Sequence, residues 1–168
     1  MGVRPLLAAV AALCIAALAA ALVSQHVYDM QPCPWCVLQR LVFALIAVIA
    51  LGALGALGAR AGTYLRPGIA RAAAAGIGVL ALAGMGTALW QHFVAASSVS
   101  CNLTLADRIM SATGLDMLWP EVFAAYASCA DAKVNLLGVP YEFWSLALYA
   151  GMAALAAMAF RAGRLAHR

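Results

Sequence analysis

The chain has 168 residues, of which 67% are hydrophobic and 10% are charged, and its formal net charge is +4. A soluble domain of this size carries roughly 25% charged residues and could not hide so much apolar surface in one core. The positive charges are too few and too scattered for a nucleic-acid-binding surface, so the composition predicts a protein that lies in lipid.

The first apolar stretch, residues 6–23, has about the length needed to cross a hydrocarbon layer of ~30 Å. Arg4 before it and the alanines at residues 19–21 are also features of a cleaved signal peptide. Because the stretch is longer than the core of a typical signal peptide, we expect a first membrane span. Cys14 lies in its middle, where we expect it to act as a small buried hydrophobic residue.

Three further apolar stretches have the length of membrane spans. They cover residues 37–57, 69–93 and 143–160. The second stretch ends in three glycines at a spacing that lets another helix approach closely: Gly52, Gly55 and Gly58. The sequence therefore predicts an all-α membrane protein, with residues 1–168 forming a single domain built on a bundle of four transmembrane helices.

The connections between the spans differ in length and polarity. Residues 58–68 form a short basic connection, whereas residues 24–36 and 94–142 are polar loops on the other side of the predicted bundle. Within the longer loop, residues 115–126 carry apolar side chains at helical spacing, which predicts a short amphipathic helix on the bilayer surface. A helix packed only on the protein's own loop fits the same pattern.

The charges predict the orientation of the bundle. Seven arginines fall on the side that holds both termini: Arg4, Arg60, Arg66, Arg71, Arg161, Arg164 and Arg168. Only Arg40, Arg108 and Lys133 fall on the other side. The positive-inside rule therefore places both termini in the cytoplasm and the two polar loops outside.

Four of the five cysteines fall outside in this topology: Cys33, Cys36, Cys101 and Cys129. A zinc site would usually show a second close cysteine pair, but Cys101 and Cys129 are 28 positions apart, so we predict no metal site. Two disulfides, Cys33–Cys36 and Cys101–Cys129, are the simpler account in an oxidising compartment. The second could be only a structural staple, whereas thiol–disulfide exchange accounts for both pairs.

Arg40 lies one helical turn after Cys36 and is expected on the same helix face. A helix N-terminus and a nearby guanidinium both favour the thiolate form of a cysteine. The guanidinium can also stabilise charge that develops on a carbonyl oxygen, although an arginine here could simply contact lipid headgroups. The sequence has no dinucleotide, haem or iron–sulfur motif. A quinone needs only an apolar slot with polar groups, which Arg40 and His92 supply if the second and third spans are neighbours.

Several short motifs together resemble a known family. The first group is Gln25-His26-Val27, Pro32-Cys33-x-x-Cys36 and Arg40. The later group is Gln91-His92, Trp119-Pro120-Glu121-Val122-Phe123, Cys129-Ala130, Leu137-Gly138 and Trp144. In this combination and order the chain resembles the disulfide bond formation protein B (DsbB) family of bacterial inner-membrane oxidases over nearly its whole length.

The resemblance implies a membrane thiol:quinone oxidoreductase with periplasmic redox cysteines and cytoplasmic termini. A periplasmic thioredoxin-fold oxidase of the DsbA type would reduce the Cys101–Cys129 disulfide, with Cys101 taking the mixed disulfide. Cys129 would then exchange with Cys33. Cys36 would pass the electrons to ubiquinone or menaquinone, supported by Arg40.

Two features depart from the family pattern. The cysteine pair encloses Pro34-Trp35 rather than two apolar aliphatic residues, and His92 lies only nine positions before Cys101. Two alternatives stay open from the sequence. One is a vitamin-K-epoxide-reductase-like oxidoreductase, in which the cysteine pair is expected late in the helix order. The other is a non-catalytic membrane scaffold with structural disulfides.

Overall fold

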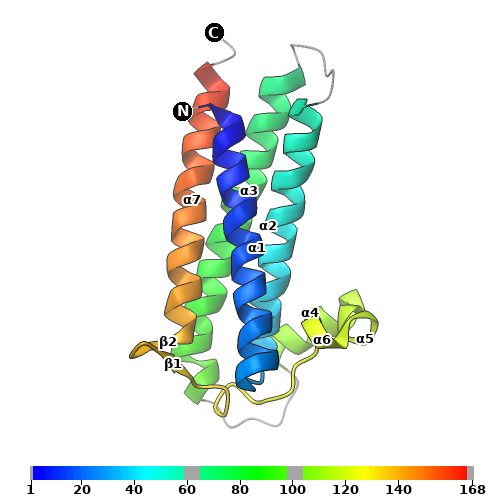
Figure 1. Cartoon of the computed structure of the whole chain (residues 1–168), viewed down its shortest axis with the longest axis vertical. Coiled ribbons are helices and arrows are strands. Elements are labelled where there is room, and N and C mark those ends of the chain that lie inside the picture. Colours follow the sequence, from blue (N-terminus) through cyan, green and yellow to red (C-terminus); the bar gives the residue numbers. More distant parts are fainter. Residues whose placement is uncertain (1, 59–64, 98–103, 166–168) are drawn as a thin grey trace.

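The computed structural model describes residues 2–58, 65–97 and 104–165. Its four long helices form an antiparallel bundle (Figure 1): α1 (Val3–Tyr28), α2 (Pro34–Gly58), α3 (Leu65–Phe93) and α7 (Tyr141–Leu165). Each packs against the next along the chain, and α7 closes the bundle against α1. All four are long and apolar enough to cross a membrane, so the chain is a multi-pass membrane protein with the predicted fold.

Both termini lie at one end of the bundle, which we call the terminal end (Figure 1). The connections from α1 to α2 and from α3 to α7 lie at the opposite end, which we call the site end. The predicted loop at residues 24–36 is shorter than expected because α1 continues to Tyr28, where Asp29 ends the helix in a left-handed conformation with φ 53°. Pro34 begins α2, since a proline in the first helical turn needs no N–H partner.

The long connection at the site end contains η1 (Ala95–Ser97), α4 (Leu105–Thr113), α5 (Leu115–Leu118) and α6 (Pro120–Phe123). The hairpin of β1 (Asn135–Leu136) and β2 (Val139–Pro140) follows, with Asn135 opposite Pro140. The prediction of one helix over residues 115–126 was wrong, because Trp119 leaves the helical conformation with φ −136° and ψ 70°. The sequence analysis also missed α4, although Thr104 and Asp107 form a capping box at its start.

The α4–α6 segment has one face on the protein and one face exposed. Met110 and Phe123 are buried in a cluster with Cys33 and Trp35 at the start of α2. On the other side, Met117, Leu118 and Trp119 are exposed. Contact between this exposed side and the bilayer stays a prediction.

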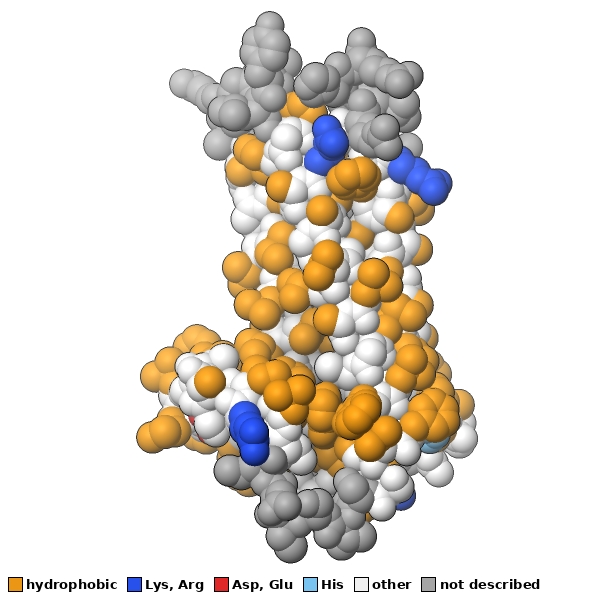
Figure 2. All heavy atoms as spheres, turned by 180° about the vertical axis from the view of Figure 1, so that it is seen from behind, with side chains coloured by type: hydrophobic (Ala, Val, Ile, Leu, Met, Phe, Trp, Pro, Cys, Tyr) orange, Lys and Arg blue, Asp and Glu red, His pale blue; other side chains and the backbone are white. Residues whose placement is uncertain are grey.

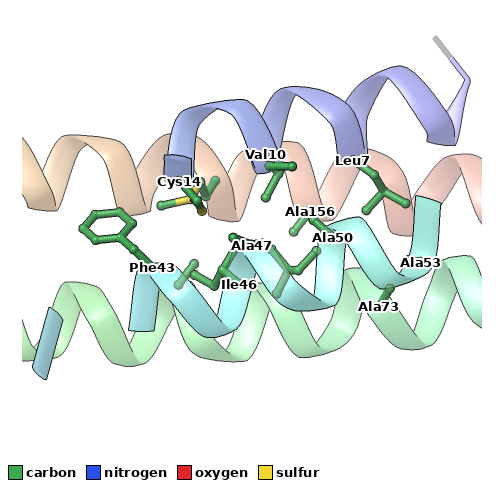
Figure 3. Close-up of a cluster of buried hydrophobic side chains, with 14 of the residues drawn as sticks. Leu7, Val10, Cys14, Phe43, Ile46, Ala47, Ala50, Ala53, Ala73 and Ala156 are labelled. Atoms are coloured by element: carbon green, nitrogen blue, oxygen red, sulfur yellow. The ribbon is translucent and has the colours of Figure 1, made fainter. Parts of the chain in front are cut away.

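The core of the bundle is built from small and branched aliphatic side chains (Figure 3). Leu7, Val10 and Cys14 of α1 point toward Ile46 and its neighbours on α2 (Figure 3). Cys14 is fully buried and its Sγ lies 3.2 Å from Sδ of Met152, so it occupies a core position as predicted.

Figure 2 shows one face of the bundle, with hydrophobic side chains over its middle and blue basic side chains confined to its two ends. The first turn of α1 contains Arg4, and Arg71 of α3 lies beside Gly163 near the end of α7. Arg60 and Arg168 lie outside the described residues. The apolar middle matches a belt that faces lipid.

The close helix contact occurs at a glycine that the spacing pattern did not indicate. A Cβ added to Gly52 or Gly55 would have no atom of the described residues within 4 Å, so these glycines bring no helices of this part of the chain together. A Cβ on Gly84 of α3 would instead overlap the ring of Tyr149 on α7. That ring stacks on Phe43, with centroids 4.3 Å apart, and its hydroxyl donates to the Gln39 carbonyl at 2.9 Å.

We expect Gly84→Ala to destabilise the bundle by about 1–3 kcal/mol, because the added methyl group overpacks a buried contact between α3 and α7. Gly86→Ala is the matched control, since nothing lies within 4 Å of its Cβ position. The control should be neutral or slightly stabilising, as alanine favours helix over glycine. Thermal unfolding of both variants in detergent measures the difference; equal stability would contradict the assignment of Gly84 to the contact.

Candidate functional site

The cysteine pair lies at the N-terminus of α2, at the site end of the bundle. Cys33 immediately precedes the helix, is fully buried, and accepts a hydrogen bond from Val37 N–H through its backbone oxygen at 3.0 Å. Cys36 lies in the first turn, and its backbone N–H donates to the Cys33 sulfur at 3.4 Å. The two Sγ atoms are 2.9 Å apart, so a disulfide can close across the turn with little movement.

Gln91 of α3 donates to the Cys36 sulfur, and Gln39 of α2 orients Gln91. The Gln91 Nε2 donates to Cys36 Sγ at 3.2 Å. The Gln91 side-chain oxygen in turn accepts a hydrogen bond of 2.7 Å from Gln39 Nε2. Both amides are buried, and because Gln39 engages the oxygen of Gln91, the NH₂ group of Gln91 is turned toward the sulfur. A donor in this position stabilises negative charge on Cys36.

Arg40 is buried, with only 6% of its surface exposed, which argues against a role as a headgroup contact. Its Nη1 donates to Gln25 Oε1 at 2.5 Å and to the Val122 carbonyl at 3.1 Å. Its Nη2 donates to the Ala21 carbonyl at 3.3 Å. The guanidinium therefore ties α2 to α1 and to α6, and among the described residues no buried side-chain nitrogen or oxygen lacks a partner.

Cys129 lies beside Cys33, although they are 96 positions apart in the chain. The carbonyl of Pro32 accepts hydrogen bonds from Tyr126 N–H at 3.0 Å and from Ala127 N–H at 3.3 Å, which fastens this part of the loop to the start of α2. Interactions with the side chains of Cys129 and then Cys36, together with burial, raise the pKa of the Cys33 thiol. Cys101, the predicted partner of Cys129, lies outside the described residues.

A cavity of about 270 Å³ opens on the other side of the pair. Most of its lining is apolar, and its polar lining includes Cys36, Gln39, Arg40, Gln91 and Glu142. Cys33 is not among the lining residues. The two sulfurs of the pair therefore have different neighbours, since Cys36 faces the cavity and Cys33 packs with Cys129.

The cavity exists because one face of α1 carries small side chains. Ala17, Ala20, Ala21 and Ser24 follow the helical repeat and line the cavity together with residues of α2 and α7. The second and third spans are neighbours, as the pairing of Arg40 with His92 requires. Among the described residues of α3 only Gln91 reaches the lining, so the space lies chiefly between α1, α2 and α7.

His92 does not line the cavity but contacts a residue that does. Its Nδ1 is 2.6 Å from Oε1 of Glu142, and Glu142 is the member of this pair that lines the cavity. The structure thus brings Cys36 and Arg40 to the cavity directly and connects His92 to it through a carboxylate. Direct binding of a cofactor by His92 stays a prediction.

The sequence analysis assigned no role to four polar residues of this site: Gln25, Gln39, Gln91 and Glu142. All four are buried. A usable signal was present, because polar side chains within or at the edge of apolar spans are costly and usually face the bundle interior. Pattern alone could not say which of them meet one another.

Comparison with known proteins identifies the family of the chain. A family profile described as "Disulfide bond formation protein DsbB" matches residues 3–159. A disulfide bond formation protein B from Herminiimonas arsenicoxydans is 35% identical over 144 residues, which is 85% of each chain. One from Azoarcus sp. strain BH72 is 35% identical over 164 residues, covering 96% of this chain and 93% of the relative.

No solved structure matches the chain. The family match covers the four spans, the cysteine pair, Arg40 and Cys129. Disulfide formation is an oxidation of thiols, so a protein of this kind is an oxidoreductase. The chain therefore belongs to the DsbB family and is a multi-pass membrane oxidoreductase of disulfide bond formation.

Proposed function

We propose that the chain is a thiol:quinone oxidoreductase that reoxidises a periplasmic dithiol oxidase of the DsbA type and passes the electrons to a membrane quinone. The observation that carries this proposal is the different surroundings of the two paired sulfurs. Cys33 packs with Cys129 from the long loop, whereas Cys36 lines the cavity that Arg40 also lines. Electrons can thus enter the pair at one sulfur and leave it at the other.

In this proposal the protein lies in the bacterial inner membrane, with the site end in the periplasm and both termini in the cytoplasm. Five arginines of the described residues belong to helix ends at the terminal end, whereas two belong to the site end: Arg4, Arg66, Arg71, Arg161 and Arg164 against Arg40 and Arg108. The acidic residues all belong to segments at the site end: Asp29, Asp107, Asp116, Glu121, Asp131 and Glu142. The excess of arginine at the terminal end supports this orientation.

The proposed reaction passes two electrons from the partner through the loop cysteines to the Cys33–Cys36 pair. A thiolate of the reduced partner attacks the Cys101–Cys129 disulfide, and the partner's second thiolate completes its own disulfide, which leaves both loop cysteines reduced. The Cys129 thiolate then attacks Cys33 in the Cys33–Cys36 disulfide and expels Cys36 as a thiolate. Cys101 attacks Cys129, restores the loop disulfide and releases Cys33, so the two electrons now lie on the Cys33–Cys36 pair.

The cavity fits the head group of a quinone. Its lining is mostly apolar with a few convergent polar groups, as in small-molecule sites generally, and about 270 Å³ accommodates one substituted ring. Ubiquinone or menaquinone bound there would accept two electrons and two protons, with return of the pair to the disulfide.

The residues around the cavity have separate tasks. Among the described residues, Arg40 donates to Gln25, Val122 and Ala21, so two of its five N–H donors have no partner in this part of the structure and can hold a carbonyl oxygen. Gln91 steadies the sulfur of Cys36. The apolar walls exclude water, which strengthens both interactions.

Two alternatives are less well supported. A vitamin-K-epoxide-reductase-like protein would carry its cysteine pair late in the helix order, but here the pair precedes the second of four spans. A non-catalytic scaffold would need no cavity against one sulfur of the pair. A non-catalytic scaffold would reduce no quinone, which the following experiment tests.

Purified protein mixed with a reduced DsbA-type oxidase and a soluble ubiquinone or menaquinone analogue should reduce one quinone for each partner disulfide formed. Quinone absorbance and thiol counting measure the two sides of this balance. Oxidation of the partner without loss of quinone would refute the proposed acceptor. If neither the thiols of the DsbA-type oxidase nor the quinone changed, the enzymatic function would be refuted and the scaffold favoured.

A further inference from the structure

His92 and Glu142 form a pair at the rim of the cavity, in which Glu142 is buried and His92 is partly exposed. Glu142, in the first turn of α7, is only 8% exposed and lines the cavity. The His92 side chain at the end of α3 is 31% exposed, and its Nδ1 lies 2.6 Å from Glu142 Oε1. Phe93 and Phe143 contact the imidazole, with ring centroids 4.8 Å and 4.6 Å away, and hold it in this position.

The proposed function creates a need for a proton donor in the cavity. Sulfur attacks as a thiolate, so the protons of the two thiols leave before the electrons are transferred. A carbonyl acceptor that takes up two electrons must also gain two protons. The mostly apolar lining of the cavity limits the delivery of these protons by water. A titratable side chain that lines the cavity can supply these protons.

Four described residues of this kind line the cavity: Cys36, Arg40, Tyr141 and Glu142. Cys36 supplies the electrons, and an arginine does not give up its proton in proteins. Within the described part of the chain, Glu142 is the one whose side chain is hydrogen-bonded to a second titratable side chain that reaches the surface.

From this geometry we infer that His92 and Glu142 form a proton relay from the aqueous surface at the site end to the cavity. The inference rests on the proposed function. Water first protonates Nε2 of the His92 imidazole, the resulting imidazolium passes its Nδ1 proton to Oε1 of Glu142, and Glu142 delivers that proton to the acceptor oxygen. Proton exchange of the neutral imidazole with water returns its proton from Nε2 to Nδ1, and two such transfers accompany each pair of electrons.

A purely structural role for the pair makes a different prediction. A carboxylate and an imidazole that only tie α3 to α7 would matter for stability, and a diffusible acid could not replace them. Chemical rescue therefore separates the two roles. Glu142→Ala opens space for a small acid, and Glu121→Ala removes an exposed carboxylate from the same end of the protein as a matched control.

The experiment follows quinone reduction by the full-length protein after its Cys33–Cys36 pair has been reduced. General acid catalysis typically contributes roughly 10²–10⁴-fold, so Glu142→Ala should slow this step by at least about tenfold. Added formate should restore part of the rate. Glu121→Ala should react at the wild-type rate with or without formate.

A second measurement needs no quinone. In ¹⁵N-histidine-labelled protein, the ring nitrogens of His92 should report a hydrogen bond at Nδ1 that Glu142→Gln alters and Glu121→Gln does not. Assignment follows from loss of one of the three histidine signals in His92→Asn. An unaltered His92 signal in Glu142→Gln would refute the contact on which the relay depends.

The failures of the two proposals can be told apart. If the wild-type protein leaves quinone unreduced, the proposed function fails and the relay fails with it. If the wild type reduces quinone and Glu142→Ala matches its rate, only the relay is refuted. A slow Glu142→Ala variant that formate does not restore also refutes the relay, because that is the behaviour of a structural ion pair.

Discussion

Replacement of Cys36 by serine is expected to abolish quinone reduction and to trap a disulfide between Cys33 and Cys129. Cys36 is the sulfur of the pair that lines the cavity, and a serine hydroxyl cannot carry electrons between a disulfide and an acceptor. Cys33 lacks its redox partner in this variant, but it still lies beside Cys129. In oxidised Cys36→Ser protein the Cys33 thiolate can attack Cys129 in the Cys101–Cys129 disulfide and release Cys101 as a thiolate, so the Cys33–Cys129 disulfide should accumulate.

Mass spectrometry of non-reduced peptides detects that disulfide, and quinone absorbance follows turnover. Cys33→Ser should also stop turnover, but it cannot form the Cys33–Cys129 bond, so the two variants separate the two sulfurs. Cys14→Ala is the control, because this cysteine packs in the bundle core and should leave turnover unchanged. If Cys36→Ser reduced quinone at the wild-type rate, the Cys33–Cys36 pair would have no part in the reaction.

Arg40→Ala is expected to raise the KM for quinone roughly 10- to 100-fold, which corresponds to the loss of one charge-assisted hydrogen bond of about 1.5–3 kcal/mol. The same change leaves Gln25 buried without its partner and frees the Val122 carbonyl. A buried unsatisfied polar group costs about 1–3 kcal/mol, so thermal stability should fall as well. The KM for the partner protein should change much less, because Arg40 is buried.

Two variants isolate the role of the guanidinium. Arg40→Lys keeps the positive charge but not the forked donor geometry, so we expect an intermediate KM for quinone. Arg108→Ala removes an exposed arginine of α4 and should leave both constants at wild-type values. If Arg40→Ala lowers stability while the KM for quinone stays at the wild-type value, Arg40 is a structural residue outside the acceptor site.

Composition and apolar length predicted the membrane spans, because a hydrocarbon layer of ~30 Å tolerates only long, uncharged helices. The helix ends were less predictable. Tyr28 and Pro34 are helical here since capping contacts and the position of proline decide where a helix stops, and these depend on neighbouring segments. Trp119 interrupts a segment whose apolar spacing alone favoured one continuous helix.

The sequence by itself determined the cysteine pair, the nearby arginine and their place at the mouth of a span, because these follow from local spacing and from the cost of charge in lipid. Only the tertiary structure decided which sulfur faces the cavity, that Cys129 reaches Cys33, and that Glu142 joins His92 to the site. Those contacts join residues 50 and 96 positions apart in the chain. Helix packing sets such distances, and no local pattern in the sequence encodes them.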